Sequence, residues 1–229
     1  MPGDAILGFD TATAATAAAV LRAGHAEEAR DDPPPGARPA HAARLLPLVR
    51  EAMAAADCGW DGLGRIAVGV GPGSFTGLRI GVATARALAQ ATGLPIAPVS
   101  TLQALAAPAL AHAPAALAVI DARRGEAFAA AWARGLEPLS APAALGPGAL
   151  AAAAAALPPG ALAVGDGALR FRLELEQAGA EVPPDASPWH RVTGAAVCRL
   201  GAAADTVAFD AVAPEYLRAP DAEPSAARP

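Results

Sequence analysis

The sequence predicts a two-lobed α/β protein in which a βββαβα unit occurs twice. Short buried strands alternate with helix-forming stretches along the chain, which is typical of parallel strands joined by right-handed crossovers. The first strand of each half ends in an aspartate, at Asp10 and Asp121. A Pro- and Ala-rich stretch from Pro108 to Pro114 separates the halves. We therefore predict a first lobe over 1–107, a second lobe over 108–220, and a polar, disordered tail over 221–229.

The first unit opens with three short strands. Ala5 to Asp10 is a buried strand, Ala15 to Arg22 consists mainly of small residues, and Glu27 to Arg30 is polar. Alanine content alone would favour a helix for the second segment. Its brevity and the turn at Gly24 instead favour an antiparallel meander of three strands.

The rest of the first unit alternates helix and strand. Apolar residues recur at helical spacing from Pro39 to Ala56, where Pro47 should kink the helix. Ser74 stands where a helix N-cap belongs, directly after a glycine turn. The elements predicted after the first helix are a strand over 66–70, a helix over 75–92, a strand over 95–100, and a helix capped by Thr101 that ends near 111.

The second unit repeats this order. A buried strand, Leu117 to Asp121, is followed by the turn Ala122 to Gly125 and by a strand from Glu126 to Ala133. The later elements predicted here are a third strand over 136–139, a helix over 148–157, a strand over 161–165, and helices over 168–178 and 193–204. Duplicated βββαβα units point to the actin-like ATPase architecture, here in a compact form.

Composition excludes several kinds of function. The chain has no lysine, so a P-loop cation or a Schiff base on lysine is excluded. The net charge of -5 argues against an extended nucleic-acid surface. Cys58 and Cys198 lack ligand-spaced partners and are expected to be buried free thiols. Neither a signal peptide nor a long apolar run is found, which predicts a cytoplasmic protein without a membrane span.

The loop after the first strand is a candidate nucleotide site. Asp10, Thr11 and Thr13 occupy the place where an actin-like ATPase holds phosphates and Mg²⁺. The usual DxGxT arrangement has a glycine where this chain has Ala12, so the backbone loses room for a phosphate. The alternative is that Asp10 and Thr11 satisfy the amides of the turn.

The stretch from Gly69 to Gly81 joins a buried strand to a long helix, and it allows two interpretations. A helix N-terminus can bind an anion. Gly77, Gly81 and Ala85 also recur every fourth residue, which leaves a smooth stripe that could receive another protein's helix. The glycine pattern matches no phosphate-binding fingerprint, so we favour the docking surface. Ser74 lacks the surroundings of a nucleophile and fits a helix cap better.

Other polar residues give weaker signals. His41 begins the first helix, but Leu45 stands one turn later, where a second metal ligand would be needed, so no metal site is predicted. Asp121, Arg123, Arg124 and Glu126 form a charged turn. This turn could be a polar site at the cleft between the lobes or an Arg–carboxylate network that ties the halves together.

Five motifs together resemble the bacterial TsaB (YeaZ) family over nearly the whole chain. The most specific is GPGSFTGLRIG, residues 71–81. The others are ILGFDTAT at 6–13, HAARLLP at 41–47, IDARR at 120–124 and PEYLR at 214–218. The resemblance implies an actin-like fold and a part in making N6-threonylcarbamoyladenosine at position 37 of tRNAs that read ANN codons. The chain departs from the family in its Ala-rich second lobe and in the longer loop Pro33 to Pro35.

The resemblance also implies the partners. TsaB is regarded as the non-catalytic partner of TsaD, with TsaE as a further ATPase component, and tRNA is reached indirectly through the complex. The same surface is expected to form homodimers in isolation. No cofactor of the chain itself is implied, although ATP or ADP with Mg²⁺ at the complex interface is an alternative. The interface positions implied are His41, Leu45, Leu46, Val49, Phe75, Gly77, Leu78, Arg79, Gly81, Val82 and Arg86.

Two other hypotheses come from different functional classes. A residual ATPase or small-molecule kinase would use Asp10 and Thr11. The second is a glycoprotease, which is an older name in this superfamily. The sequence does not support it, because no zinc ligand set or serine triad can be assembled. The first hypothesis remains a non-catalytic scaffold that stabilises and activates TsaD.

Overall fold

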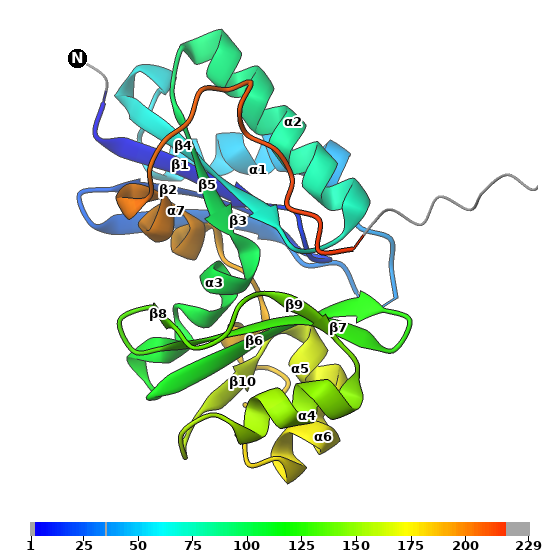
Figure 1. The fold of residues 1–229 in the computed structure, drawn as a ribbon. Coiled ribbons are helices and arrows are strands. Elements are labelled where there is room, and N and C mark those ends of the chain that lie inside the picture. Colours follow the sequence, from blue (N-terminus) through cyan, green and yellow to red (C-terminus); the bar gives the residue numbers. More distant parts are fainter. Residues whose placement is uncertain (1–2, 35, 219–229) are drawn as a thin grey trace, which may run out of the picture.

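The computed structural model of the protein describes residues 3–34 and 36–218 (Figure 1). Two sheets lie one above the other, each at the centre of one lobe. The first sheet has the order β3-β2-β1-β4-β5, and the second has the order β10-β6-β7-β8, with β9 also paired to β7. The predicted two-lobed α/β fold is confirmed. The predicted tail over 221–229 lies outside the described residues.

The first sheet combines an antiparallel meander with two parallel strands. β1 pairs antiparallel with β2, β2 pairs with β3, and β4 and β5 add in parallel on the other side of β1. The polar third strand lies at the sheet edge, where one side is free of strand neighbours. The strands are β1 (Ala5–Asp10), β2 (Thr16–Arg22), β3 (His25–Asp31), β4 (Leu63–Gly71) and β5 (Ile96–Ser100).

Helices α1 (His41–Ala55) and α2 (Phe75–Thr92) cover one face of this sheet. Their apolar stripes contact alternate residues of the strands, which is why both helices lie parallel to the sheet surface. α1 continues through Pro47 without a break. The N-cap at Ser74 is confirmed, because the Ser74 side chain accepts a hydrogen bond from the Gly77 N–H.

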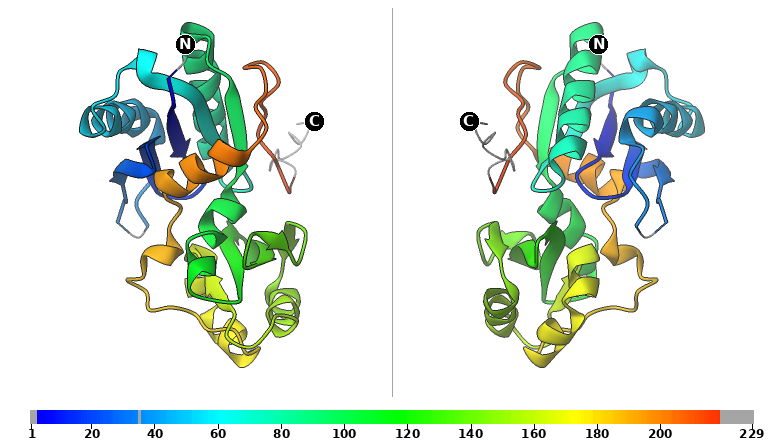
Figure 2. Two further views of the ribbon diagram at one scale, coloured as in Figure 1. Left: turned by 90° about the vertical axis from the view of Figure 1, so that its left-hand side faces the viewer. Right: turned by 90° about the vertical axis from the view of Figure 1, so that its right-hand side faces the viewer.

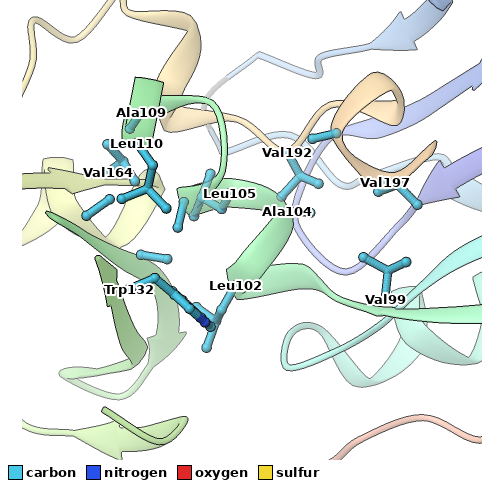
Figure 3. Packing of buried hydrophobic residues seen from close by; sticks show 14 of the residues in the cluster. Val99, Leu102, Ala104, Leu105, Ala109, Leu110, Trp132, Val164, Val192 and Val197 are labelled. Atoms are coloured by element: carbon cyan, nitrogen blue, oxygen red, sulfur yellow. The ribbon is translucent and has the colours of Figure 1, made fainter. Parts of the chain in front are cut away.

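The opposite face of the first sheet is covered by α7 (Gly194–Ala203), and α3 (Thr101–Ala106) lies between the two sheets. Figure 3 shows Leu102 and Leu105 of α3 packed among residues of both lobes, including Trp132 and Val164. One apolar core therefore extends across the junction of the lobes. The predicted cap at Thr101 is wrong, because Ser100 caps this helix by accepting from the Gln103 N–H. A separate 3-10 turn, Ala109–Ala111, follows α3.

The second sheet departs from the prediction in its third strand. This strand is divided into two short pieces, β8 and β9, which both pair with β7. Helices α4, α5 and α6 cover the outer face of the sheet, and the single helix predicted over 168–178 is interrupted at Phe171. The elements are β6 (Ala115–Arg123), β7 (Glu126–Ala133), β8 (Glu137–Pro138), β9 (Ala143–Leu145), α4 (Pro147–Ala155), β10 (Leu162–Val164), α5 (Asp166–Arg170) and α6 (Arg172–Gln177).

The chain returns to the first lobe after the second sheet (Figure 2). α7 packs on β1 and β2, because Gly194 and Gly201 let its backbone approach the sheet closely. After α7, Val207 pairs with Ile96 of β5. We therefore propose that residues 194–218 be counted with the first lobe, although the sequence predicts a second lobe over 108–220. In the described part of the chain, none of the helices is both long and apolar enough for a membrane span.

Candidate functional site

A cavity of about 510 Å³ lies between the lobes. Its first-lobe wall is formed by the β1–β2 loop, the loop before α1 and the start of α2, and its second-lobe wall by the end of β6 and the start of α5. The chain after α7 supplies a third wall. The polar side chains around it are Thr13, Ser74, Asp121, Arg123, Asp166, Tyr216 and Arg218.

Asp10 does not face this cavity. Its side chain is enclosed, with the residue 1% exposed. Oδ1 accepts the Ala12 N–H at 2.7 Å, and Oδ2 accepts the Thr101 hydroxyl at 2.8 Å. Burial raises the pKa of Asp10, and these two hydrogen bonds oppose that rise. The carboxyl is therefore engaged in holding the turn and joining β1 to α3.

Thr11 is also directed into the first lobe. Its hydroxyl donates to the Gly77 carbonyl at 2.7 Å, and the residue is buried. Thr13 alone of the three predicted loop residues lines the cavity. The Ala12 side chain is buried as well, and a Cβ at Gly73 would meet it at 2.7 Å. The β1–β2 loop is consequently closed on itself and on α2.

The glycine stripe of α2 faces the chain's own first sheet. A Cβ at Gly77 would lie 1.9 Å from the Thr11 carbonyl oxygen, and a Cβ at Gly81 would lie 2.5 Å from the Thr11 hydroxyl. Ala85 is fully buried on the same side. The reason given above for a docking surface, room at the glycines for another protein's helix, is therefore wrong. Thr11 of the same chain occupies that room.

The structure divides the predicted interface residues into two groups. Leu46 is 48% exposed, Arg79 and Arg86 are exposed, and Phe75 is half-buried. Arg79 and Arg86 contact Tyr216 and the Asp210 carbonyl of the segment after α7. The remaining predicted residues lie inside the first lobe, and they are His41, Leu45, Val49, Gly77, Leu78, Gly81 and Val82. These buried residues cannot contact a partner directly. They can support a docking surface only by holding α1 and α2 in position.

A different stripe of α2 is exposed. Thr76, Ala83, Ala87 and Ala91 are exposed, small and uncharged, and they share one side of the helix. We call these four residues the outer face of α2. This stripe was not predicted, because the glycines on the other side of the helix gave the stronger signal. Its spacing of seven, four and four residues was readable from the sequence.

His41 is a buried histidine without a second ligand nearby. Its Nδ1 is hydrogen-bonded to the Thr16 hydroxyl at 2.8 Å, and its Nε2 has no partner within the described ranges. Burial lowers the pKa of His41, although the Asp31 carboxylate opposes this. Among residues 3–34 and 36–218, no group of three His, Cys, Asp or Glu side chains could hold a metal ion.

The charged turn of the second lobe forms an Arg–carboxylate network. Asp121 accepts two hydrogen bonds from Arg170 at 2.8 and 2.9 Å and one from the Arg123 N–H at 2.9 Å. Asp166 accepts the Asp121 N–H at 3.1 Å. Arg170 and Asp166 were not predicted to take part, and they lie 49 and 45 residues beyond Asp121. Asp121 and Asp166 line the second-lobe wall together with Arg123, so this wall carries charged groups of both signs.

Comparison with known proteins gives the chain's family. The family model for TsaD, tRNA N6-adenosine threonylcarbamoyltransferase, matches residues 33–163, which is more than half of the 229 residues. The chain belongs to this family. The TsaD-family match includes α1, α2 and most of the second sheet.

Several relatives carry TsaB or YeaZ names, so the resemblance to that group is confirmed. The chain is 37% identical to the tRNA threonylcarbamoyladenosine biosynthesis protein TsaB of Haemophilus influenzae over 125 residues, covering 54% of this chain and 51% of that protein. It is 37% identical to the Escherichia coli protein of the same name over 131 residues, covering 56% and 55%. The matched stretch therefore spans about half the length of these curated relatives.

A solved structure covers nearly the whole chain. It comes from Pseudomonas aeruginosa and is described as an uncharacterized protein with similarity to the peptidase YeaZ. The TM-score is 0.79 at 29% identity, over 95% of this chain and 100% of that chain. The two-lobed arrangement is thus shared over 95% of this chain.

Replacing Asp10 with asparagine tests whether this residue is structural. Because burial raises the folded-state pKa, the native state keeps its proton to higher pH than the unfolded state. The stability that Asp10 contributes is present below about pH 4 and is lost as the pH rises through the folded-state pKa. We expect Asp10→Asn to be at least as stable as the wild type at pH 7, with an advantage that grows from pH 4 upward.

Denaturant unfolding at several pH values measures this difference. Asp10→Ala is the control, because it removes both hydrogen bonds and should cost about 1–3 kcal/mol. A loss of more than about 1 kcal/mol in Asp10→Asn at pH 7 would show that the native state needs the charged carboxylate.

Proposed function

We propose that this chain is a non-catalytic partner of TsaD in forming N6-threonylcarbamoyladenosine at position 37 of tRNAs that read ANN codons. The family match and the names of the TsaB relatives support this proposal. So does the similarity to a YeaZ-like structure over 95% of the chain. The reaction would take place in the cytoplasm, where tRNA is modified.

The enclosure of Asp10 and Thr11 is the observation that carries the non-catalytic role. An actin-like ATPase needs these positions to face the nucleotide between the lobes. Here both side chains are hydrogen-bonded within the first lobe. Ala12 is packed against Gly73, so a phosphate finds little space beside the loop backbone. The cavity consequently lacks the metal- and phosphate-binding wall that catalysis would need.

The partner surface proposed here is the outer face of α2 together with Leu46 of α1. Exposed apolar side chains on packed helices are typical of helix-docking sites, and small residues let a second helix approach closely. The buried residues of the predicted interface would hold α1 and α2 in position on the sheet. TsaD would dock there, TsaE would join as a further ATPase component, and tRNA would be reached through the complex. Without TsaD, two copies of the chain would pair through the same surface.

Size-exclusion chromatography with light scattering tests the partnership. The purified chain is mixed with TsaD from the same organism at micromolar concentration. We expect one peak whose mass equals the sum of the two chains. Separate elution of the two proteins at every ratio would contradict the proposal.

A residual ATPase or small-molecule kinase is the second candidate. The interlobe cavity of about 510 Å³ favours it, since a cavity of this size accommodates a small molecule. The inward-facing Asp10 and Thr11 speak against it. The Pseudomonas aeruginosa structure is described by its similarity to a peptidase. In this chain Ser74 is engaged as a helix cap, which speaks against its use as a nucleophile.

A further inference from the structure

The segment after α7 crosses from the first lobe to the second. We call residues 207–218 the C-terminal strap. It begins beside β5, where the Ile96 N–H donates to Val207 and the Val207 N–H donates back, at 3.1 and 2.7 Å. Figures 1 and 2 show it running along α2 towards the space between the lobes. It includes the motif PEYLR at 214–218, to which the proposed function gives no role.

The strap is anchored firmly to the first lobe. Val212 is 2% exposed and belongs to the apolar core between the first sheet and its helices. The Glu215 N–H donates to the Val70 carbonyl at 2.7 Å. Gly71 makes this approach possible, because a Cβ there would lie 2.6 Å from the Glu215 carbonyl oxygen. The buried Val212 side chain and the Glu215–Val70 hydrogen bond hold residues 212–215 against the end of β4.

Aromatic and cationic side chains continue the attachment along α2. The ring centroids of Tyr216 and Phe75 are 5.0 Å apart, and the Arg79 guanidinium lies over the Phe75 ring, 3.8 Å from its centroid. Arg79 also donates to the Tyr216 hydroxyl at 3.3 Å. Further back, Arg86 donates to the Asp210 carbonyl at 2.6 Å. The strap therefore reaches the rim of the interlobe cavity in a fixed position.

Arg218 then makes the contact with the second lobe. One guanidinium nitrogen donates to Glu126 Oε2 and the other to the Ala122 carbonyl, both at 2.8 Å. Glu126 and Ala122 belong to the β6–β7 hairpin, whose strands line the cavity through Ala122 and Phe128 among others. Tyr216, Leu217 and Arg218 line the same cavity from the strap side. The strap thus closes one side of the cavity and bonds across it.

We propose that the C-terminal strap is a clasp that holds the two lobes together over the interlobe cavity, with Arg218 as its releasable end. The two ends differ in kind. At the first-lobe end Val212 is buried in the apolar core, whereas the side chains of the Arg218–Glu126 pair are 31% and 41% exposed. An exposed ion pair is weak and breaks readily. Release of Arg218 opens the cavity between the strap and the β6–β7 hairpin, while the contacts of Val212 and Tyr216 with the first lobe stay intact.

Cysteine labelling measures this opening. Ala122 is buried at the cavity wall, so Ala122→Cys places a thiol that a maleimide reaches only when the clasp is open. We expect the additional change Arg218→Ala to raise the labelling rate at position 122 about tenfold, which corresponds to ~1.4 kcal/mol. Mass spectrometry of the digested chain assigns the labelled position.

The chain offers internal controls. Cys198 is fully buried in the core of the first lobe, so it labels only on wider unfolding. Arg134→Ala removes an exposed arginine of the second lobe that does not line the cavity, and it should leave the rate at position 122 unchanged. Arg218→Glu alone should raise the labelling rate at position 122. Adding Glu126→Arg exchanges the two charges and should lower that rate again by restoring the ion pair.

Two results would overturn the clasp. One is a labelling rate at position 122 that stays within twofold of its value before Arg218→Ala. The other is parallel labelling of Cys198 in both Arg218→Ala and Glu126→Gln, since that would mean loss of the fold and not release of one contact.

Discussion

Replacing Gly77 with alanine is expected to destabilise the folded chain by about 3 kcal/mol. In an exposed helix position, glycine to alanine normally stabilises by about 1 kcal/mol. Here the added Cβ would lie 1.9 Å from the Thr11 carbonyl oxygen, so the β1–β2 loop or the start of α2 must move. That movement would also break the hydrogen bond from the Thr11 hydroxyl to the Gly77 carbonyl. The melting temperature should fall by roughly 10 °C.

Gly148→Ala is the matched control. Gly148 lies in the first turn of α4, and a Cβ there meets no atom within 4 Å. The control should be neutral or stabilising by up to about 1 kcal/mol. A Gly77→Ala protein as stable as the Gly148→Ala protein would mean that the glycine stripe does not pack against its own sheet. The docking interpretation of Gly77 and Gly81 would then return.

Replacing Ala83 with arginine is expected to abolish most of the binding to TsaD without unfolding the chain. Ala83 is exposed at the middle of the outer face of α2, so the free protein accommodates the longer side chain in solvent. In a packed helix–helix contact the same side chain has no space, and its charge is desolvated. We expect affinity for TsaD to fall on the order of thirtyfold or more, about 2 kcal/mol.

The control for this prediction is Ala152→Arg. Ala152 is an exposed alanine in the middle of α4, in the other lobe. It should leave both stability and TsaD affinity unchanged. Gly81→Arg is unsuitable as a test of the interface, because a Cβ at Gly81 already collides with the Thr11 hydroxyl. Full affinity in Ala83→Arg would remove the outer face of α2 from the proposed surface.

The order of elements could be predicted well from the sequence, because it depends on local patterns. The strand from Ala5 to Asp10 and the helix from Phe75 to Thr92 have the predicted bounds. The strand is a short apolar run that ends before turn residues, and the helix is long, periodic and capped. The divided third strand of the second lobe was not predictable, since its two pieces are two and three residues long and carry no alternation.

The orientation of the site could be predicted only in part. Helical spacing identifies which residues of α2 share a side, but it does not say which side faces the sheet. Gly77 and Gly81 were therefore assigned to a partner, although Thr11 occupies the space beside them. The contact of Arg218 with the second lobe could not be predicted for a related reason. Its partners, Ala122 and Glu126, lie 96 and 92 residues away, and no periodic pattern joins them.

The role of Asp10 could be predicted from its neighbour Ala12. Alanine at position 12, where a phosphate loop would have glycine, suggested that the loop satisfies its own amides. The structure has that arrangement, with the Ala12 N–H bonded to Asp10 Oδ1. The bond from Thr101 to Asp10 was not foreseen, since the two residues are 91 positions apart.

Threonylcarbamoyl transfer to tRNA in a reconstituted mixture tests the central claim most directly. The mixture contains TsaD, TsaE, the threonylcarbamoyl donor and a tRNA that reads an ANN codon, with or without the purified chain. Our account predicts that modified adenosine at position 37 accumulates only when the chain is present, and that Asp10→Asn supports the reaction as well as the wild type. Equal modification in the absence of the chain, or loss of activity in a folded Asp10→Asn protein, would contradict a non-catalytic partner of TsaD.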